Sequence, residues 1–123
     1  MLLEVPYSEV LDKWTILALK TTRLPSVEAR EAVAADLNAI TSAWSEEGLP
    51  APATLREFSE LQEVNARLWD VEEALRRHER EQTFGEAFVT LARSVYQLND
   101  RRSALKRALD LRLGSARTEW KSY

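Results

Sequence analysis

Apolar residues recur at intervals of three and four along most of this sequence, and glycine and proline seldom interrupt them. The most regular stripe consists of Leu61, Val64, Leu68, Val71 and Leu75. Such spacing places apolar side chains on one face of an α-helix. With three glycines and four prolines in 123 residues, the chain has too few turns for a fold of short strands. The sequence therefore predicts an all-α fold.

Four helices are expected, because the apolar stripes break at three places along the chain. The first break is at Pro25 and Ser26, and the second is the loop 48–53, whose two prolines bias their neighbours towards extended backbone. The third is a tight turn near residue 82. We expect helices at about residues 8–24, 26–47, 54–81 and 83–113, followed by an irregular tail at 114–123.

Residues at the expected helix ends are suited to capping. Ser8 is expected to cap the first helix, and Gly114 is expected to end the fourth in a left-handed conformation. Two capping boxes, each a threonine followed three residues later by a glutamate, are expected to open the third and fourth helices. The boxes are Thr54 with Glu57 and Thr83 with Glu86.

The tight turn near residue 82 predicts that the last two helices fold back antiparallel. We therefore expect one domain, 1–123, built from two antiparallel helical hairpins, the C-terminal one longer. At 1.5 Å per residue the last two helices span roughly 40 Å and the first two roughly 25 to 30 Å. The long hairpin should overhang the short one and leave part of its apolar stripe open. A symmetric homodimer is the expected cover.

Composition and charge narrow the classes of function. The 17 lysines and arginines against 20 aspartates and glutamates give a net charge of −3, so a nucleic-acid partner is not expected. The chain has no cysteine, which excludes disulfides, a thiolate metal site and a cysteine nucleophile. Its start lacks a signal-peptide pattern, and no apolar run approaches the roughly 20 residues that span a bilayer. We expect a cytoplasmic protein with no membrane association.

A polar seam interrupts the apolar stripe of the fourth expected helix. The stripe advances from Leu98 to Leu105, and the position between them falls on Arg101 or Arg102. Burying an unpaired guanidinium costs several kcal/mol, so a carboxylate, a ligand anion or water must accompany it. Polar rows at helical spacing flank the stripes of both helices. They are Asn65, Trp69, Glu72 and Arg76 on the third helix, and Tyr96, Asn99, Ser103, Lys106 and Asp110 on the fourth.

Two interpretations of this seam stay open. One is a buried polar network that fixes the register of the helices, with Glu72 meeting Arg102 or Asn99. The other is a pocket for a small anion, with two cations for charge, two amides for orientation and two aromatic walls. These pairs are, in that order, Arg102 and Lys106, Asn65 and Asn99, and Trp69 and Tyr96.

Candidate chemistry beyond binding is sparse. Glu72 is the one carboxylate placed for general acid or base duty, although such a position is more often structural. His78, the single histidine, is expected to be a packed or capping residue, and no set of nucleophile, base and orienting group can be assembled. Glu57, Glu60 and Glu63 repeat every three residues, as in a magnesium cluster, but we expect them to form a solvated acidic face. No metal and no cofactor is expected.

Several polar motifs lie where helix formation alone does not demand them. They are Val5-Pro6, Ser8, Asp12-Lys13, Lys20, Glu63-Val64-Asn65, Leu68-Trp69-Asp70, Leu91-Ala92-Arg93, Tyr96, Asn99-Asp100-Arg101-Arg102, Lys106, Gly114-Ser115 and Lys121-Ser122-Tyr123. Over nearly the whole chain they resemble a family of small bacterial helical proteins of unknown function. The resemblance implies a bacterial origin and no particular activity. It adds Asp12, Lys13 and Lys20 to the candidate ligand-binding residues.

Three functions are hypotheses at this point. The first is a homodimeric binding or interaction protein whose basic polar seam holds a small anionic ligand. The second is a small cofactor-independent enzyme that uses the same seam; a weaker likeness to helical chorismate mutases rests on fold analogy alone. The third is a structural adaptor that uses the tail from Trp120 to Tyr123.

Overall fold

The structure, a computed structural model, describes residues 1–115 and is all-α, with no strand in that range. Its helices are α1 (Tyr7–Arg23), α2 (Val27–Glu46), α3 (Arg56–Glu81) and α4 (Glu86–Leu113), with a short 3-10 turn, η1 (Pro52–Thr54), before α3. The predicted fold class and the four helices are confirmed. Most of the expected tail, including Trp120 and Tyr123, lies outside the described residues.

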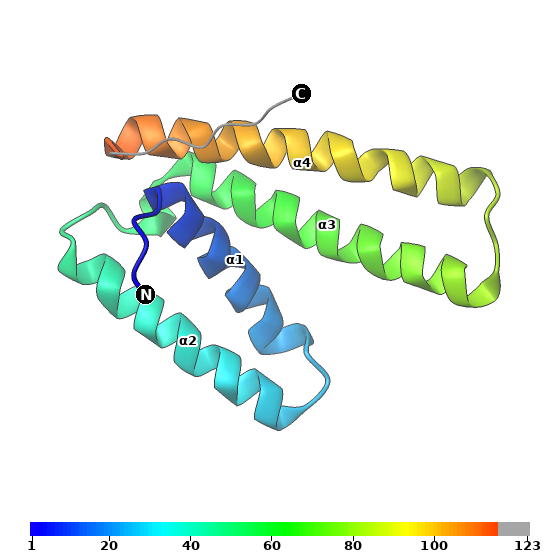
Figure 1. Cartoon of the computed structure of the whole chain (residues 1–123), viewed down its shortest axis with the longest axis horizontal. Helices are drawn as coiled ribbons and strands as arrows, with labels where there is room; N and C mark the ends of the chain where they lie inside the picture. Colours follow the sequence, from blue (N-terminus) through cyan, green and yellow to red (C-terminus); the bar gives the residue numbers. More distant parts are fainter. Residues whose placement is uncertain (116–123) are drawn as a thin grey trace.

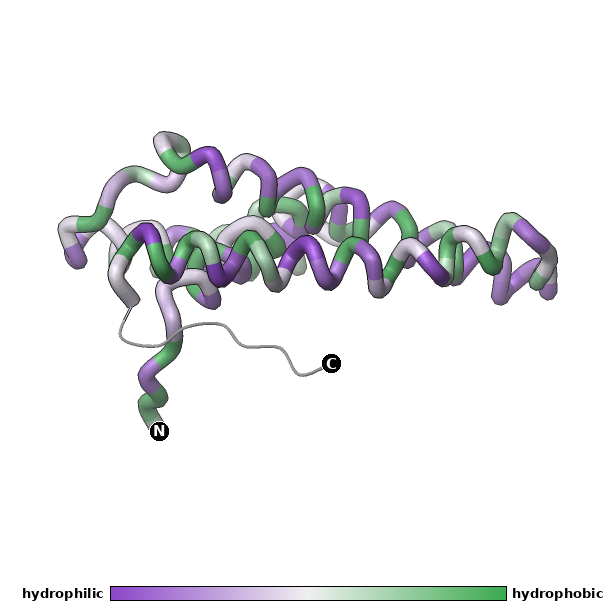
Figure 2. Tube along the Cα trace, turned by 90° about the horizontal axis from the view of Figure 1, so that it is seen from above, coloured by the Kyte–Doolittle hydropathy of each residue, from purple (hydrophilic) through white to green (hydrophobic). Residues whose placement is uncertain are grey.

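The helices form two antiparallel hairpins that meet at one end and diverge (Figure 1). The short hairpin is α1 with α2, and the long hairpin is α3 with α4. Helix α1 lies between the two, because it contacts α2 on one side and both α3 and α4 on the other. The tip of the long hairpin extends well beyond the short one, also when the molecule is seen from above (Figure 2). The expected overhang is therefore present.

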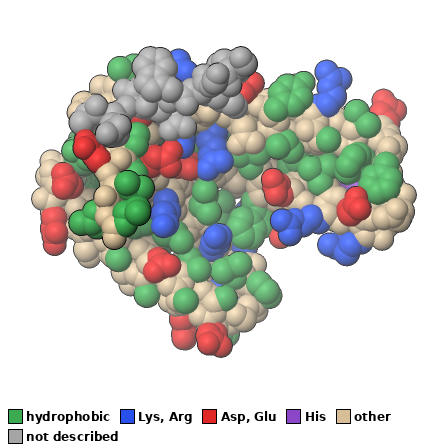
Figure 3. Space-filling view, viewed as in Figure 1, with side chains coloured by type: hydrophobic (Ala, Val, Ile, Leu, Met, Phe, Trp, Pro, Cys, Tyr) green, Lys and Arg blue, Asp and Glu red, His purple; other side chains and the backbone are tan. Residues whose placement is uncertain are grey.

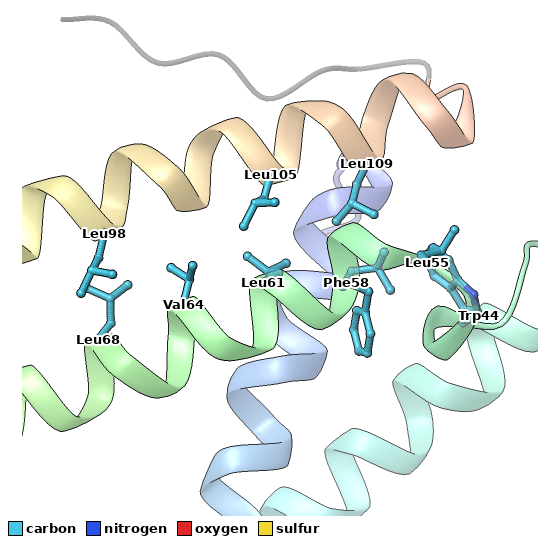
Figure 4. Packing of buried hydrophobic residues seen from close by; sticks show 10 residues of the cluster. Trp44, Leu55, Phe58, Leu61, Val64, Leu68, Leu98, Leu105 and Leu109 are labelled. Atoms are coloured by element: carbon cyan, nitrogen blue, oxygen red, sulfur yellow. The ribbon is translucent and has the colours of Figure 1, made fainter.

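The hydrophobic core lies where the hairpins meet. Leu68 faces Leu98, and Leu61 lies opposite Leu105 (Figure 4). Leu11 of α1 completes this cluster, and α2 contributes one fully packed side chain, Trp44, whose indole donates a hydrogen bond to the carbonyl of Pro50 at 2.9 Å. The core therefore joins all four helices at the base of the long hairpin.

Burial falls along the long hairpin once α1 has diverged from it. At the base, Leu61 and Leu109 are fully buried. Nearer the tip, Val95 of the same stripe is only half-buried, and Phe84 and Val89 are 47% and 49% exposed. The stripe that the core residues begin thus continues into a region without a third layer.

The expectation that Ser8 caps the first helix is wrong. Helix α1 begins after Pro6, and Ser8 lies inside its first turn. The backbone amide and hydroxyl of Ser8 donate hydrogen bonds to the Asp110 carboxylate at 3.0 and 2.8 Å. Ser115 adds a third hydrogen bond to Asp110 at 2.8 Å. A carboxylate of α4 therefore satisfies the start of α1.

Both expected capping boxes are also wrong. Helix α3 begins at Arg56, and Thr54 instead donates to the carbonyl of Ala51 at 2.6 Å within η1. Helix α4 begins at Glu86 after Gly85, while the Thr83 hydroxyl lies 2.7 Å from Nδ1 of His78. In each case the threonine is engaged by a turn that the preceding chain forms.

A left-handed residue ends each of the two long helices. Gly114 has φ 67°, as expected from the sequence, and Gln82 has φ 56° at the end of α3. The His78 ring packs against Phe88 with centroids 6.1 Å apart. His78 is thus a packed residue of the hairpin tip, as predicted.

Candidate functional site

Asp12 of α1 is the centre of a polar network between α1, α3 and α4. It is 4% exposed. Arg102 donates from Nε to Oδ1 at 2.9 Å and from Nη2 to Oδ2 at 2.5 Å, and Asn65 donates from Nδ2 to Oδ1 at 2.9 Å. Two parallel hydrogen bonds between a guanidinium and a carboxylate form one of the strongest and most directional pairs in proteins. Arg102 is therefore held inside the bundle by a partner on another helix.

Lys106 extends the network by one helical turn. Its side chain is 8% exposed and donates to Oε1 of Glu9 at 2.5 Å, and it lies 3.9 Å from Oδ2 of Asp12. The expectation that Glu72 would meet Arg102 or Asn99 is wrong, because Asp12 occupies that place. The pattern showed that α3 and α4 face each other, but not that α1 crosses both of them.

The environment of Asp12 keeps its carboxylate ionised. Burial alone would raise the pKa of Asp12, but hydrogen bonds from Arg102 and Asn65 and the positive charges of Arg102 and Lys106 outweigh it. The pKa is therefore lowered from its ordinary value of 3.8. At neutral pH this corner of the bundle holds a fixed anion between two cations.

A pocket of about 440 Å³ lies beside this network, between α1 and the long hairpin. It is lined by Ile16, Leu19, Asn65, Leu68, Trp69, Glu72, Glu73, Arg76, Asn99 and Arg102. The hollow between the two hairpins is visible in the space-filling view (Figure 3). Its volume falls within the range of about 300 to 1,000 Å³ found for small-molecule sites.

One wall of the pocket is apolar. Its apolar residues are Ile16 and Leu19 of α1 together with Leu68 and Trp69 of α3. The Trp69 indole donates to Oε1 of Glu73 at 3.0 Å. The Arg23 guanidinium lies 5.9 Å from the centroid of the same ring, within range of a cation–π contact. Contacts at its edge and over its face thus fix the indole as a wall.

The two ends of the pocket are polar. At the inner end, Asn65 gives its amide hydrogens to Asp12 and to Thr15, which leaves its Oδ1 as an acceptor. Nη1 of Arg102, the terminal nitrogen that does not bind Asp12, lies 3.4 Å from Oδ1 of Asn99. At the outer end stand the exposed Glu72 and Arg76. The ends are about 16 Å apart, since eleven residues of α3 at 1.5 Å each separate them.

Six of the candidate residues from the sequence line this pocket: Asn65, Trp69, Glu72, Arg76, Asn99 and Arg102. The other five do not belong to its lining. Asp12 and Lys106 lie buried behind it, Lys13 is exposed, Lys20 is half-buried, and Tyr96 is 53% exposed further along α4.

The sequence predicted Trp69 as a wall of the pocket but not the aliphatic residues of that wall or Glu73. Ile16 and Leu19 carried a usable signal, because they are the apolar residues of α1 that fall off its main stripe. They point away from the neighbour that this stripe contacts, so a second contact surface on α1 follows from their positions. Leu68 belongs to the main apolar stripe of α3. The sequence pattern placed it in the core and did not indicate that it also lines the pocket.

Within residues 1–115, no group of three histidine, aspartate or glutamate residues is placed to hold a metal ion. The expectation of a solvated face for the acidic repeat is wrong at Glu57, which is buried and pairs with Arg112 at 2.7 Å. Glu72 is exposed, so it lacks the water-excluded surroundings that acid–base catalysis uses.

No helix in the described range is long and apolar enough to cross a membrane.

Comparison with known proteins gives no relative: no family model, no curated protein and no solved structure matches the chain. The resemblance to small bacterial helical proteins therefore stays a prediction. A function for this chain has to be inferred from the geometry and chemistry of the pocket.

Proposed function

We propose that this protein binds a small organic anion with an apolar body in the pocket between α1 and the long hairpin. The observation that carries the proposal is the combination of a fixed aromatic and aliphatic wall with a guanidinium at each polar end. Small-molecule sites are typically apolar clefts in which a few placed polar groups set the orientation.

The outer end of the pocket is where the anionic group of the ligand binds. Arg102 is already neutralised by Asp12, whereas Arg76 is exposed at the mouth. A carboxylate at Arg76 would gain a charge-assisted hydrogen bond. The apolar body of the ligand then lies against Trp69, and a hydrogen-bonding group at its other end reaches Oδ1 of Asn65.

The proposal includes a homodimer, because the long hairpin leaves apolar side chains open beyond the reach of α1. Phe84, Val89 and Tyr96 are each about half exposed, at 47%, 49% and 53%. Clustered exposure of this kind typically marks an interaction surface. The cytoplasmic location and bacterial origin remain predictions from the sequence.

The test uses three matched probes that share one apolar body: 3-phenylpropionate, 3-phenylpropanol and 3-phenylpropylamine. Binding is followed by the NMR signal of the Trp69 indole N–H, assigned with Trp69→Phe. The carboxylate is expected to shift this signal with the highest affinity of the three. Equal affinities for all three probes, or an unmoved Trp69 signal, would contradict an anion site.

A pair of neighbouring arginines supplies the matched variants. Arg76→Gln is expected to weaken binding of 3-phenylpropionate about tenfold, which corresponds to roughly 1.4 kcal/mol. Arg77→Gln makes the same change at an exposed position outside the lining and should leave the affinity unchanged. Equal effects of both variants would show that general charge, and not the pocket, attracts the probe.

A further inference from the structure

The side of the long hairpin that meets α1 continues, uncovered, to the tip. On α3, Asn65 reaches α1, and residues 72, 76 and 80 continue its side at helical spacing. On α4, Lys106 reaches α1, and residues 99, 95, 92 and 88 continue its side. We name the part beyond α1 the distal strip. It consists of Glu72, Arg76 and Arg80 of α3 with Phe88, Ala92, Val95 and Tyr96 of α4.

The distal strip is apolar along α4 and charged along α3. Phe88 and Val95 are half-buried, Ala92 is exposed, and Tyr96 is 53% exposed. Figure 3 shows apolar side chains gathered along the outer half of the long hairpin, with charged side chains at their lower edge. The opposite side of α4 carries the polar residues Thr90, Ser94, Gln97 and Arg101. The apolar surface therefore belongs to one side of the hairpin.

The open apolar area matches what one half of a stable interface needs. Phe84 and Tyr96 are each about half exposed and together leave about 200 Å² open, since an aromatic side chain can bury about 150 to 250 Å². Val89 and the half-buried residues Val71, Leu75, Phe88, Leu91 and Val95 bring the open apolar area of the outer half of the long hairpin, the distal strip and its flanks taken together, to roughly 400 Å². A standard interface takes about 800 Å² per partner, a little over half of it apolar, or about 450 Å².

We propose that a second copy of this chain covers the distal strip, with the two long hairpins antiparallel about a two-fold axis. The register within the hairpin shows which residues of α3 and α4 lie at one level. Leu68 is level with Leu98 and His78 with Phe88, so Arg76 is level with Thr90. An axis at this level lays each α3 on the partner's α3, in the reverse direction, and each α4 on the partner's α4.

This register sets Arg76 opposite the partner's Arg76 at the axis, and it sets large against small and acidic against basic side chains on either side of the axis. Phe88 lies opposite the partner's Ala92, so a large side chain meets a small one from both sides, as close packing of helices requires. Glu72 lies opposite the partner's Arg80, which gives two salt bridges of opposite sense across the axis. A two-fold contact repeats every such pairing, so each favourable contact counts twice.

The arrangement rests on the homodimer of the proposed function and deepens it, because it fixes the surface, the axis and the contacts of that dimer. It also brings the turn at the partner's hairpin tip to the level of Asp70, next to the outer end of the pocket. The dimer is tested by molecular mass alone, so the outcome is independent of whether the pocket binds an anion.

Molecular mass by sedimentation equilibrium tests the interface. At about 100 µM protein, where mass action favours the dimer, the wild-type chain is expected at twice its 14.1 kDa. Ala92→Arg places a charge opposite the partner's Phe88 and is expected to raise the dissociation constant roughly 100-fold. The matched control Thr90→Arg makes a similar change on the other side of α4 and should stay dimeric. Far-UV circular dichroism verifies that both variants fold, and Tyr96→Glu replaces Ala92→Arg if that variant does not.

A charge exchange tests the register. Glu72→Arg and Arg80→Glu should each weaken the dimer, and the two changes in one chain should restore it to within a few-fold of wild type. A monomeric wild-type chain, a dimer that withstands both Ala92→Arg and Tyr96→Glu, or a doubly exchanged chain that is weaker than either single variant would overturn the proposal.

Discussion

Replacement of Asp12 by asparagine tests the central ion pair of the bundle. The substitution preserves shape and removes the charge that Arg102 and Lys106 share. The side chains of Asp12, Arg102 and Lys106 are 6%, 29% and 8% exposed. We expect Asp12→Asn to destabilise the fold, because it removes the charged carboxylate that accepts two hydrogen bonds from Arg102 and lies 3.9 Å from Lys106.

The size of the effect follows from these exposures. Removing one member of a fully buried pair costs about 3 to 5 kcal/mol. Arg102 keeps access to water, so we expect a value near the lower end, about 3 kcal/mol. With a urea m-value of about 1.5 to 2 kcal/mol per molar, the midpoint of unfolding should fall by roughly 1.5 to 2 M.

Urea unfolding at pH 7, followed by far-UV circular dichroism, measures this loss. Arg23→Met is the control, because it breaks the exposed pair of Arg23 and Asp70, whose side chains are 33% and 66% exposed, and should cost below about 1 kcal/mol. The double variant of Asp12→Asn with Arg102→Met should be more stable than the sum of the two single losses predicts. A cost for Asp12→Asn no larger than that of the control would refute the reasoning.

Three further predictions concern stability. Because the folded pKa of Asp12 lies below its unfolded value near 3.8, its contribution is complete above that pH and is lost as pH falls through the folded pKa; acid unfolding of Asp12→Asn should therefore show a smaller pH dependence below pH 4. Asp110→Ala removes the acceptor of three hydrogen bonds and should cost about 3 kcal/mol in urea unfolding, against about 1 kcal/mol for Ser115→Ala. Gln82→Gly relieves a left-handed residue at φ 56° and should raise the free energy of unfolding by about 0.5 to 1 kcal/mol, net of the lost hydrogen bond to the carbonyl of Glu79. An unchanged or lower melting temperature in thermal scans would contradict this expectation.

The periodicity of the sequence was enough to predict the four helices and their pairing into hairpins. The stripe from Leu61 to Leu75 predicts an α-helix by itself, because a period of about 3.6 residues places all of its side chains on a single face. The overhang followed from helix length alone. Gly114 could be predicted because a glycine after a long stripe serves a local need of the backbone.

What failed depended on contacts between segments far apart in the chain. Ser8 was expected to cap its own helix and Arg102 to meet Glu72 of the preceding helix, whereas the structure supplies their partners from 102 and 90 positions away. A charged residue at a predicted core position does indicate that some partner must compensate its charge. Sequence periodicity shows which face of a helix is buried, but not which third helix arrives there, and Asp12 could be found only once the path of α1 was known.

The hydrogen bonds from Ser8 to Asp110 have a consequence for the order in which the chain folds during synthesis. Helix α1 leaves the ribosome before the other three helices, yet the acceptor for its first turn belongs to the end of α4, the last of the four. The long hairpin consists of two helices adjacent in sequence and can form as soon as both are synthesised, whereas closing α1 onto it requires hydrogen bonds between residues 102 and 108 positions apart. Of these four helices, the one that is synthesised earliest is thus the last to reach its final contacts.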